Sequence, residues 1–439
     1  MVFGTTILGS NPSAPAKIMK KFIKNLTFTI NKYFFPFYKS KDIKLLFKNL
    51  EEGMPKEKEV AMFVGGCVRN FLQSKKIGDI DIATIFTPDD LKKKFHNSNF
   101  KVIDTGLAHG SVTVVSDDKK YELTTLRKDI KTDGRHAEIE TIDNWKEDSK
   151  RRDFTINAIY LNKNGKIFDP QQGINDLNSN VVKFIGDPQT RIEEDFLRII
   201  RFLRFSIQYN SSVESSTMQA LKLKLNGIKN LSKERVLSEL LKILKLENFF
   251  KIIYNENLLT IFTLVFPEFQ NIHRLKNFRS LKGHIEISEI LLLSILLVDL
   301  KGNHEYFCHK YKVPNKIYDN LNLLGEKFKD CKNDKEYFKK KLKNNLYDIG
   351  KKNMIILFCL DLLDKKKISM KEISFLKSIE KILIPKFPFD GKFLIKKGIQ
   401  EGKTIGIILK EAEKIWVLNN FNLPSKEFET IIKKNTISS

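Results

Sequence analysis

The sequence predicts an α+β fold in which a head with a mixed sheet and helices precedes an all-helical neck, body and tail. Two observations predict this order. Between residues 46 and 180, short segments rich in β-branched and aromatic residues alternate with helical segments. From Pro188 onward, apolar residues recur with the 3.6-residue period of helices, and no fixed repeat is evident. Strands followed by a long run of helices are typical of an α+β assembly.

Individual elements follow from the same patterns. In the head, we expect strands at residues 61–64, 79–83, 112–115 and 121–126, and helices at 68–74 and 88–96. Beyond the head, we expect helices that include residues 188–206, 233–246, 287–299 and 354–363.

We expect the 439 residues to fall into four parts. Residues 1–45 form a basic extension that we expect to be disordered, 46–180 the head, 181–250 a helical neck, and 251–439 a helical body and tail. The extension is open to three interpretations: an RNA-binding arm, an organelle-targeting segment, or an upstream addition from a misplaced start codon. Because it is rich in Lys rather than Arg, targeting is the weaker one. We therefore expect a cytoplasmic protein, or an organellar matrix protein if the extension is a targeting segment.

The charge of the chain favours a polyanionic partner. Lys and Arg number 77 against 53 Asp and Glu, so the formal net charge is +24. An excess of this size is typical of proteins that bind nucleic acid or an anionic membrane surface. The longest apolar stretch, Ile290–Val298, is too short to span a bilayer and predicts a core helix. We therefore expect nucleic acid and no membrane partner.

The cysteines predict neither a disulfide framework nor a zinc site. There are four, Cys67, Cys308, Cys331 and Cys359, and none forms a CxxC pair or lies beside a histidine cluster. We expect free, buried thiols of the kind found in a reducing compartment.

A first motif combines a Gly-Gly turn with an arginine. The expected strand 61–64 ends at Gly65-Gly66, and a helix is expected directly afterwards. Two glycines let backbone N–H groups approach a phosphate chain closely, and a helix N-terminus favours negative charge. Arg69 projects from the first turn and can pair with a phosphate.

Two carboxylates follow on the next expected strand. Asp79 and Asp81 are two positions apart, so strand geometry places both on one face. Carboxylates about 6–7 Å apart along a strand can share one or two hard cations such as Mg²⁺. Glu122, on the expected strand 121–126, is a candidate third carboxylate. An isolated Asp-x-Asp pair is more often an exposed strand edge, but the Gly-Gly turn just upstream favours a metal site.

Together these residues resemble the signature of polymerase-β-like nucleotidyltransferases. Gly65-Gly66-Cys67-Val68-Arg69 followed by Asp79-x-Asp81 resembles the branch that unites class II (bacterial-type) CCA-adding enzymes and bacterial poly(A) polymerases. The family has Asp after the motif arginine, where this chain has Asn70. The resemblance implies that the neck recognises nucleobases and that the body and tail bind tRNA. It also implies a flexible loop at residues 127–150, which are polar.

A second motif is Arg151-Arg152-Asp153. From the residues alone, Asp153 suits a helix N-cap, while Arg152 can point into a cleft. The match to the family's second motif is specific. By resemblance, Arg152 contacts the nucleotide and Asp153 helps to sense the ribose 2′-hydroxyl.

A third motif lies on the expected helix 188–206. Asp195, Arg198, Arg201 and Arg204 recur every three residues and predict one polar stripe on an otherwise apolar helix. Asp195 and Arg198 can present an acceptor and donors to a base edge. Cytosine and adenine both offer an amine donor beside a ring-nitrogen acceptor, whereas uracil and guanine present the reverse pattern. One Asp–Arg pair can therefore accept CTP and ATP and reject UTP and GTP. By resemblance, Arg201 and Arg204 also reach the nucleotide.

These features predict an enzyme that adds C, C and A to the tRNA 3′ end from CTP and ATP. Asp79 and Asp81 would hold two Mg²⁺ ions, and the tRNA 3′-hydroxyl would displace pyrophosphate from the α-phosphate in line. Poly(A) polymerase and A-only or CC-only tRNA nucleotidyltransferase remain alternatives because they share the motifs. A non-catalytic RNA-binding protein is a more remote alternative, which the intact carboxylates disfavour.

Overall fold

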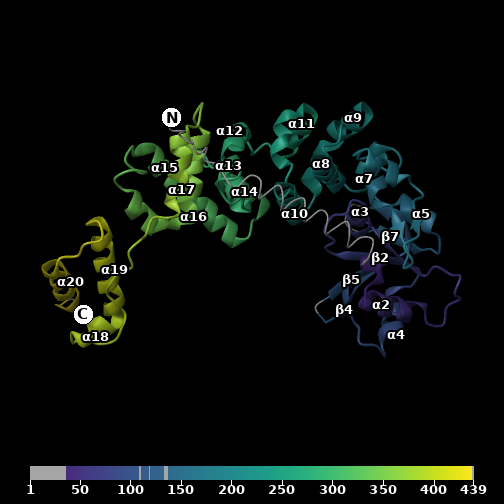
Figure 1. The fold of residues 1–439 in the computed structure, drawn as a ribbon, viewed down its shortest axis with the longest axis horizontal. Helices are drawn as coiled ribbons and strands as arrows, with labels where there is room; N and C mark the ends of the chain where they lie inside the picture. Colours follow the sequence, from purple (N-terminus) through teal and green to yellow (C-terminus); the bar gives the residue numbers. More distant parts are fainter. Residues whose placement is uncertain (1–35, 108–109, 118, 133–136, 438–439) are drawn as a thin grey trace, which may run out of the picture. The chain divides into compact units, whose positions relative to one another are not determined.

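The structure, a computed structural model, describes residues 36–437 except 108–109, 118 and 133–136. The chain divides into two compact units, Met1–Ser232 and Lys233–Ser439. Within the described residues, every strand belongs to the first unit, and the second unit is helical (Figure 1). The predicted α+β class is therefore confirmed. The division into extension, head, neck and body stays a prediction.

The first unit contains a seven-stranded sheet in the order β3-β4-β5-β2-β1-β8-β9. Its strands are β1 (Ala61–Val64), β2 (Ile80–Thr84), β3 (Lys101–Gly106), β4 (Ser111–Ser116), β5 (Lys119–Thr125), β8 (Tyr160–Leu161) and β9 (Ile167–Phe168). A separate antiparallel pair consists of β6 (Arg127–Thr132) and β7 (Ala137–Thr141). The helices are η1 (Phe37–Lys39), α2 (Lys41–Glu51), α3 (Gly66–Leu72), α4 (Pro88–Phe95), α5 (Trp145–Lys150), η3 (Thr155–Asn157), α6 (Gly173–Asn178), α7 (Pro188–Glu194), α8 (Leu197–Tyr209), α9 (Ser215–Lys224) and η4 (Leu225–Asn230).

Strand β2 lies at the centre of the sheet and carries the candidate metal site. It runs antiparallel to β1, with Phe63 opposite Ile82, and parallel to β5, with Asp81 opposite Glu122. All four residues of β1 are buried, as are the last three of β2. The middle of the sheet is thus buried, whereas the first two residues of β2 are only partly buried.

The ordered head begins closer to the N-terminus than residue 46. Residues 36–45 were expected in a disordered extension, but they form η1 and the first part of α2. The ring of Phe37 lies 4.9 Å from that of Phe63 and 5.6 Å from that of Phe71. These contacts between aromatic rings explain why the segment packs on the sheet. Residues 1–35 of the predicted extension lie outside the described residues.

A second difference concerns residues 127–150, which were expected to form a flexible loop. Strands β6 and β7 pair antiparallel there, and α5 follows. Asn144 caps α5 by accepting hydrogen bonds from the backbone N–H groups of Lys146 and Glu147. These residues therefore include a hairpin and a helix rather than one irregular loop, whereas the flexibility implied by the resemblance stays a prediction; residues 133–136 lie outside the described residues.

The second unit is built from helices. They are α10 (Lys233–Leu244), η5 (Phe249–Tyr254), α11 (Glu256–Val265), α12 (Arg274–Leu281), α13 (Glu289–Leu297), α14 (Asn303–Tyr311), α15 (Asn315–Asn333), α16 (Leu342–Leu363), α17 (Met370–Ile379), α18 (Gly391–Lys396), α19 (Lys403–Leu418) and α20 (Ser425–Ile437). Every residue from Leu291 to Leu297 in α13 is buried, which confirms the predicted core helix. All four cysteines are free and buried, also as predicted. Among the described helices, none combines the length and apolar character needed to cross a membrane.

Candidate active site

The Gly-Gly turn brings the first motif against strand β2. Gly65 has φ +72° and ψ −128°, a conformation that side chains rarely adopt, and α3 begins at the next residue. A Cβ atom on Gly65 would lie 3.5 Å from Oδ2 of Asp81, and one on Gly66 would lie 3.9 Å from Nη2 of Arg69. The turn therefore sits directly beside a carboxylate and an arginine of the predicted site.

Three carboxylates influence one another at the start of β2. Asp79 is exposed and directly precedes the strand, whereas Asp81 lies within it and is half-buried. Burial, followed by the negative charge of Glu122, raises the pKa of Asp81 to about 6; Asp79 adds to the increase, while Arg152 and Arg69 oppose it. Two carboxylates and two guanidinium groups therefore lie close enough to Asp81 to act on its charge.

The described residues do not form a ready-made metal cage of three or more His, Cys, Asp or Glu side chains. Glu122 lies opposite Asp81 in the adjacent strand, and its role as a third metal ligand stays a prediction. Mg²⁺ is commonly held by only one or two carboxylates together with substrate phosphates. The two carboxylates, with Glu122 beside them, fit an ion of that kind.

Arg69 links the first motif to the second. Its side chain is buried, and Nη1 donates a hydrogen bond to Oδ1 of Asn157. Nδ2 of Asn157 in turn donates to Oδ1 of Asp153 at 2.9 Å. Sequence reasoning assigned no role to Asn157, although it lies only four residues after Asp153 in the Arg-Arg-Asp-Phe-Thr-Ile-Asn segment.

Asp153 is fully engaged by protein donors. Oδ1 also accepts from the backbone N–H of Phe154 at 2.9 Å, and Oδ2 accepts from Nε and Nη2 of Arg201 at 2.8 and 2.6 Å. Burial raises the pKa of Asp153, but Arg201 and Asn157 outweigh it and hold the pKa at about 2. A carboxylate offers about four acceptor positions. Contact with a ribose hydroxyl, the role implied by resemblance, therefore requires one of these four donors to move aside.

Arg152 is held by two residues that the sequence did not single out. Its Nη2 donates to Oδ2 of Asp148 at 3.1 Å, and its Nε donates to the Tyr160 hydroxyl at 3.0 Å. That hydroxyl donates to the same Asp148 oxygen at 2.7 Å, and Arg151 binds the other. Burial raises the pKa of Asp148, but the two arginines hold it at about 2. The spacing of Asp148 three and four residues before the arginines could have signalled this ion pair.

The third motif does not lie on one continuous helix, so this part of the sequence prediction was wrong. Helix α7 ends at Glu194, Asp195 is extended with φ −156° and ψ 107°, and α8 begins at Leu197. Oδ1 of Asp195 accepts a hydrogen bond from the Leu197 N–H at 3.1 Å. The ring of Phe196 packs directly on Gly227. A Cβ atom on Gly227 would lie only 2.1 Å from this ring, so a larger residue would not fit. The hydrogen bond to Asp195 and this close packing together explain the break.

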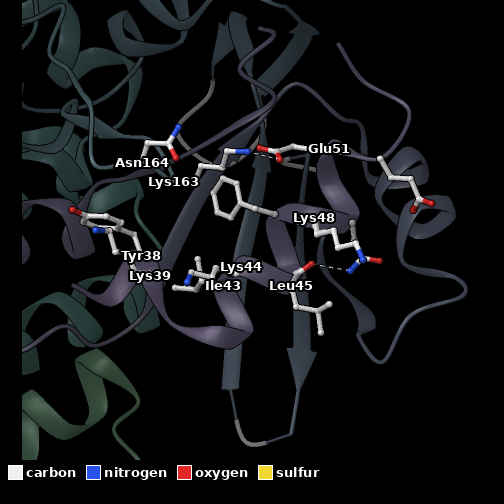
Figure 2. A pocket seen from close by; sticks show the side chains of 12 residues that line it. Tyr38, Lys39, Ile43, Lys44, Leu45, Lys48, Glu51, Lys163 and Asn164 are labelled. Carbon is white, nitrogen blue, oxygen red and sulfur yellow. Dashed lines mark hydrogen bonds and ion pairs between the residues drawn. The ribbon is translucent and has the colours of Figure 1, made fainter. Parts of the chain in front are cut away.

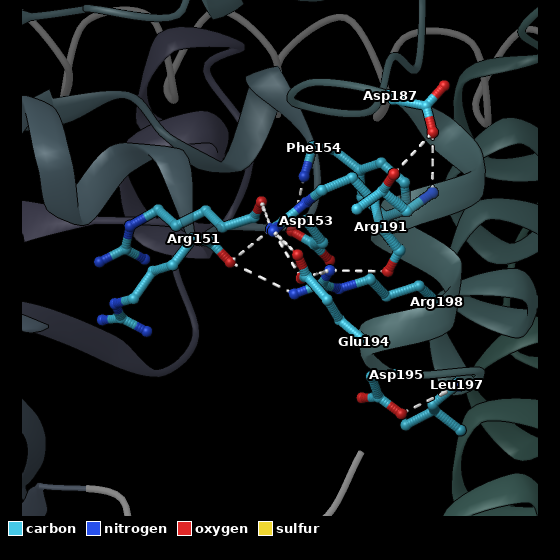
Figure 3. A network of polar contacts seen from close by, with 11 residues as sticks. Arg151, Asp153, Phe154, Asp187, Arg191, Glu194, Asp195, Leu197 and Arg198 are labelled. Carbon is cyan, nitrogen blue, oxygen red and sulfur yellow. Dashed lines mark hydrogen bonds and ion pairs between the residues drawn. The ribbon is translucent and has the colours of Figure 1, made fainter. Parts of the chain in front are cut away.

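Arg198 connects the third motif to the second. Its Nη1 donates to Glu194 at 2.5 Å and to the Arg191 carbonyl at 2.7 Å, and its Nη2 lies 3.3 Å from the Arg151 carbonyl (Figure 3). Arg191 binds the carbonyls of Arg151 and Arg152, each at 2.7 Å. The second and third motifs are therefore adjacent, while base recognition by Asp195 with Arg198 stays a prediction.

Three guanidinium groups gather around the buried ring of Phe205. The central carbon lies 4.1 Å from the ring centroid in Arg204, 4.9 Å in Arg69 and 5.7 Å in Arg201. Cation–π attraction favours each contact, but the three like charges repel one another. A polyanionic ligand would relieve that repulsion, as expected for residues that bind a triphosphate.

A surface hollow of about 1010 Å³ elsewhere on the first unit is not this site. It is lined by α2 together with Lys163 and Asn164, and Lys163 reaches Glu51 at 2.5 Å (Figure 2). None of the described residues that line it belongs to the three motifs.

Comparison with known proteins agrees with the geometry. Residues 61–183 match the family described as poly A polymerase head domain. The chain is 30% identical over 403 residues to the mouse protein named CCA tRNA nucleotidyltransferase 1, mitochondrial, covering 88% of this chain and 89% of that one. It is 34% identical over 303 residues to the CCA-adding enzyme of Staphylococcus haemolyticus, covering 69% of this chain and 72% of that one.

Solved structures support the fold. The Bacillus stearothermophilus CCA-adding enzyme in complex with CTP matches with a TM-score of 0.64 and 22% identity, over 91% of this chain and 99% of that one. The Thermotoga maritima CCA-adding enzyme complexed with tRNA matches with a TM-score of 0.60 and 20% identity, over 91% and 95%. Given its coverage of these relatives and its identity to the sequence relatives, this chain belongs to the class II CCA-adding enzyme family of tRNA nucleotidyltransferases, which share the poly(A) polymerase head domain.

Proposed function

We propose that this chain adds C, C and A in turn to the 3′ end of tRNA, using CTP and ATP and releasing pyrophosphate. One observation carries the proposal. In a single unit, the carboxylates around Asp81 lie within electrostatic reach of Arg69, which itself belongs to the guanidinium cluster around Phe205. A nucleoside triphosphate and its metal ions need that combination of negative and positive groups. The names of the relatives, which match over most of both chains, supply the substrate.

Asp79 and Asp81 are the residues that would hold two Mg²⁺ ions. Carboxylates are the ligands that hard cations prefer, and the two side chains are only two positions apart in the sequence. When bound, such ions would activate the attacking hydroxyl and stabilise the oxygens of the leaving pyrophosphate. The protein residues themselves align the carboxylates: β2 fixes Asp81, and the Gly65 turn leaves room beside it.

The nucleotide would contact all three motifs. Gly66 and Arg69 would hold phosphates at the start of α3. Arg152, which is held in place by hydrogen bonds to Asp148 and Tyr160, would contribute a further guanidinium group. Arg201 and Arg204 would complete the positive surface. Asp153 would act mainly by orienting Arg201 and Asn157, since these occupy its oxygens.

Asp195 and Arg198 would select the base. Asp195 lies in the extended break between α7 and α8, and Arg198 lies in the first turn of α8, so both side chains start close to the same bend. Adenine and cytosine would satisfy the pair, whereas uracil and guanine would leave buried polar groups unpaired, which is strongly unfavourable.

An incorporation assay tests the proposal. Purified protein is incubated with labelled tRNA lacking CCA and with each nucleoside triphosphate singly or together. We expect CTP alone to add two nucleotides, CTP with ATP to add three, and UTP or GTP to add none. Long A tails on an unstructured RNA would instead identify a poly(A) polymerase, and addition confined to A or to CC would identify a partial enzyme. The compartment stays a prediction: the cytoplasm, or an organellar matrix as the name of the mouse relative suggests.

A further inference from the structure

A cavity of about 400 Å³ opens on the helical unit, remote in sequence from the three motifs. Its walls come from the C-terminal half of α16, from α17, and from the turns that follow α15. The volume lies within the range of roughly 300–1,000 Å³ that is usual for small-ligand sites. Nothing in the proposed reaction uses this cavity.

Phenylalanines form its apolar surface. Phe358 is buried at the centre, with ring centroids 4.9 Å from Phe338 and 5.0 Å from Phe375. Both pairs are close to perpendicular, at 68° and 73°. Phe338 and Phe375 are only partly buried, so each ring keeps surface available for a flat aromatic ligand.

Lysines surround the phenylalanines. Lys335, Lys339 and Lys371 line the cavity and are exposed, and no acidic side chain among the described residues forms an ion pair with them.

The acidic residues of the cavity wall are already neutralised. Asp361 pairs with Lys332 at 3.0 Å and with Lys365 at 3.2 Å, and Glu372 pairs with Lys365 at 2.9 Å. The free charge at the cavity is therefore positive, which favours an anionic ligand.

We propose that this cavity binds an unpaired nucleotide of the RNA substrate, with its base against Phe338 and Phe375 and its phosphates near the three free lysines. Aromatic rings beside a positively charged surface are the usual means of holding single-stranded nucleotides without sequence preference. An acidic peptide would use the lysines alone and leave the aromatic surface without a function. The inference rests on the proposed tRNA substrate, and it adds a second contact outside the first unit.

Binding of tRNA to the full chain tests it. The dissociation constant for a tRNA transcript lacking CCA is measured by fluorescence anisotropy at several salt concentrations. We expect Phe338→Leu and Phe375→Leu each to weaken binding about tenfold, the effect of losing one stacked base. Lys371→Gln should weaken binding less. It should also lower the slope of log affinity against log salt concentration by about one, the contribution of one released counterion. The matched controls are Tyr254→Leu and Lys352→Gln, both exposed in the same unit but outside the cavity, and they should bind as the wild type does.

Two further readouts separate the inference from the proposed function. The KM for CTP and the kcat at saturating tRNA should stay unchanged in the phenylalanine variants, because the motifs are intact. If the wild type binds tRNA through the cavity but adds no nucleotide, the proposed function fails while the binding site stands. Unchanged tRNA affinity in both phenylalanine variants, with native melting temperatures, overturns the inference.

Discussion

Arg201 and Asp153 are 48 residues apart in the sequence, yet two guanidinium nitrogens of the arginine lie 2.8 and 2.6 Å from one oxygen of the aspartate. The other oxygen accepts from Asn157, which accepts in turn from Arg69. A continuous path of hydrogen bonds therefore joins the three motifs. Disturbing one link should displace several phosphate-binding groups together.

Asn157→Ala tests that path. Arg69 and Asp153 each lose a buried partner, and leaving such groups unsatisfied costs about 1–3 kcal/mol. We expect the KM values for CTP and ATP to rise together, by about tenfold, because both nucleotides would use the same phosphate contacts. Steady-state kinetics with each nucleotide measures this. Asn162→Ala, another buried asparagine of the same unit, removes a hydrogen bond to Glu59 remote from the motifs and should leave both KM values unchanged. An equal change in the two variants would contradict the path.

Arg198→Ala tests base selection. The variant loses its contacts to Glu194 and to the Arg151 carbonyl, and with them the donors proposed to face the base. We expect the preference for CTP over UTP, measured as a ratio of kcat/KM values, to fall at least about tenfold. The matched control is Glu193→Ala, which changes a residue on the same helix as Glu194, α7. It removes an ion pair with Lys224 of α9 and should preserve the preference. An unchanged ratio in Arg198→Ala would remove this residue from base recognition.

Gly65→Ala tests the turn before α3. Alanine at φ +72° is strained, typically by about 1–3 kcal/mol, and its Cβ would approach the Asp81 carboxylate. We expect a lower melting temperature and a loss of nucleotide addition. Gly78→Ala is the matched control: it lacks a positive φ, and an added Cβ would meet nothing within 4 Å. If Gly65→Ala melts and reacts as the wild type does, the turn has no special role.

The lowered pKa of Asp148 predicts how the stability of the first unit depends on pH. Its pKa in the folded state is about 2, below the ordinary value of 3.8. Because the folded pKa is the lower one, the stabilisation is fully present above about pH 4 and is lost as the pH falls towards 2. The shift corresponds to about 2 kcal/mol. We expect the difference in unfolding free energy between wild type and Asp148→Asn to shrink between about pH 5 and about pH 2.5.

Trp145 fluorescence can follow this transition, because its ring lies 5.8 Å from that of Tyr160, which binds Asp148. The chain has two tryptophans, so a Trp416→Phe background isolates the signal from the first unit. A difference that stays constant with pH would show that Asp148 contributes no net charge stabilisation.

Much of the head could be predicted because local patterns determine it. The strand Ala61–Val64 was predicted at its observed bounds, and the Gly-Gly turn before α3 follows from the need for positive φ at Gly65. These features depend on short-range geometry that the sequence displays directly.

The rest depends on contacts between residues far apart in the chain. The helical period continues through Asp195, so the break before α8 could not be predicted without the packing of Phe196 against Gly227. The roles of Asn157 and Tyr160 likewise arise from partners that only folding brings close. The carboxylates of the site were thus easier to predict than the groups that orient its arginines.

The central claim is that Asp79 and Asp81, at the start of β2, drive addition of CCA. Sequencing the 3′ ends of a tRNA transcript lacking CCA, after incubation with CTP, ATP and Mg²⁺, tests it most directly for the wild type, Asp79→Asn and Asp81→Asn. The account predicts CCA ends with the wild type and at least about a 100-fold slower reaction with either variant, as expected when a group that stabilises transition-state charge is lost. Equal rates in all three proteins, or ends extended only by A, would contradict it.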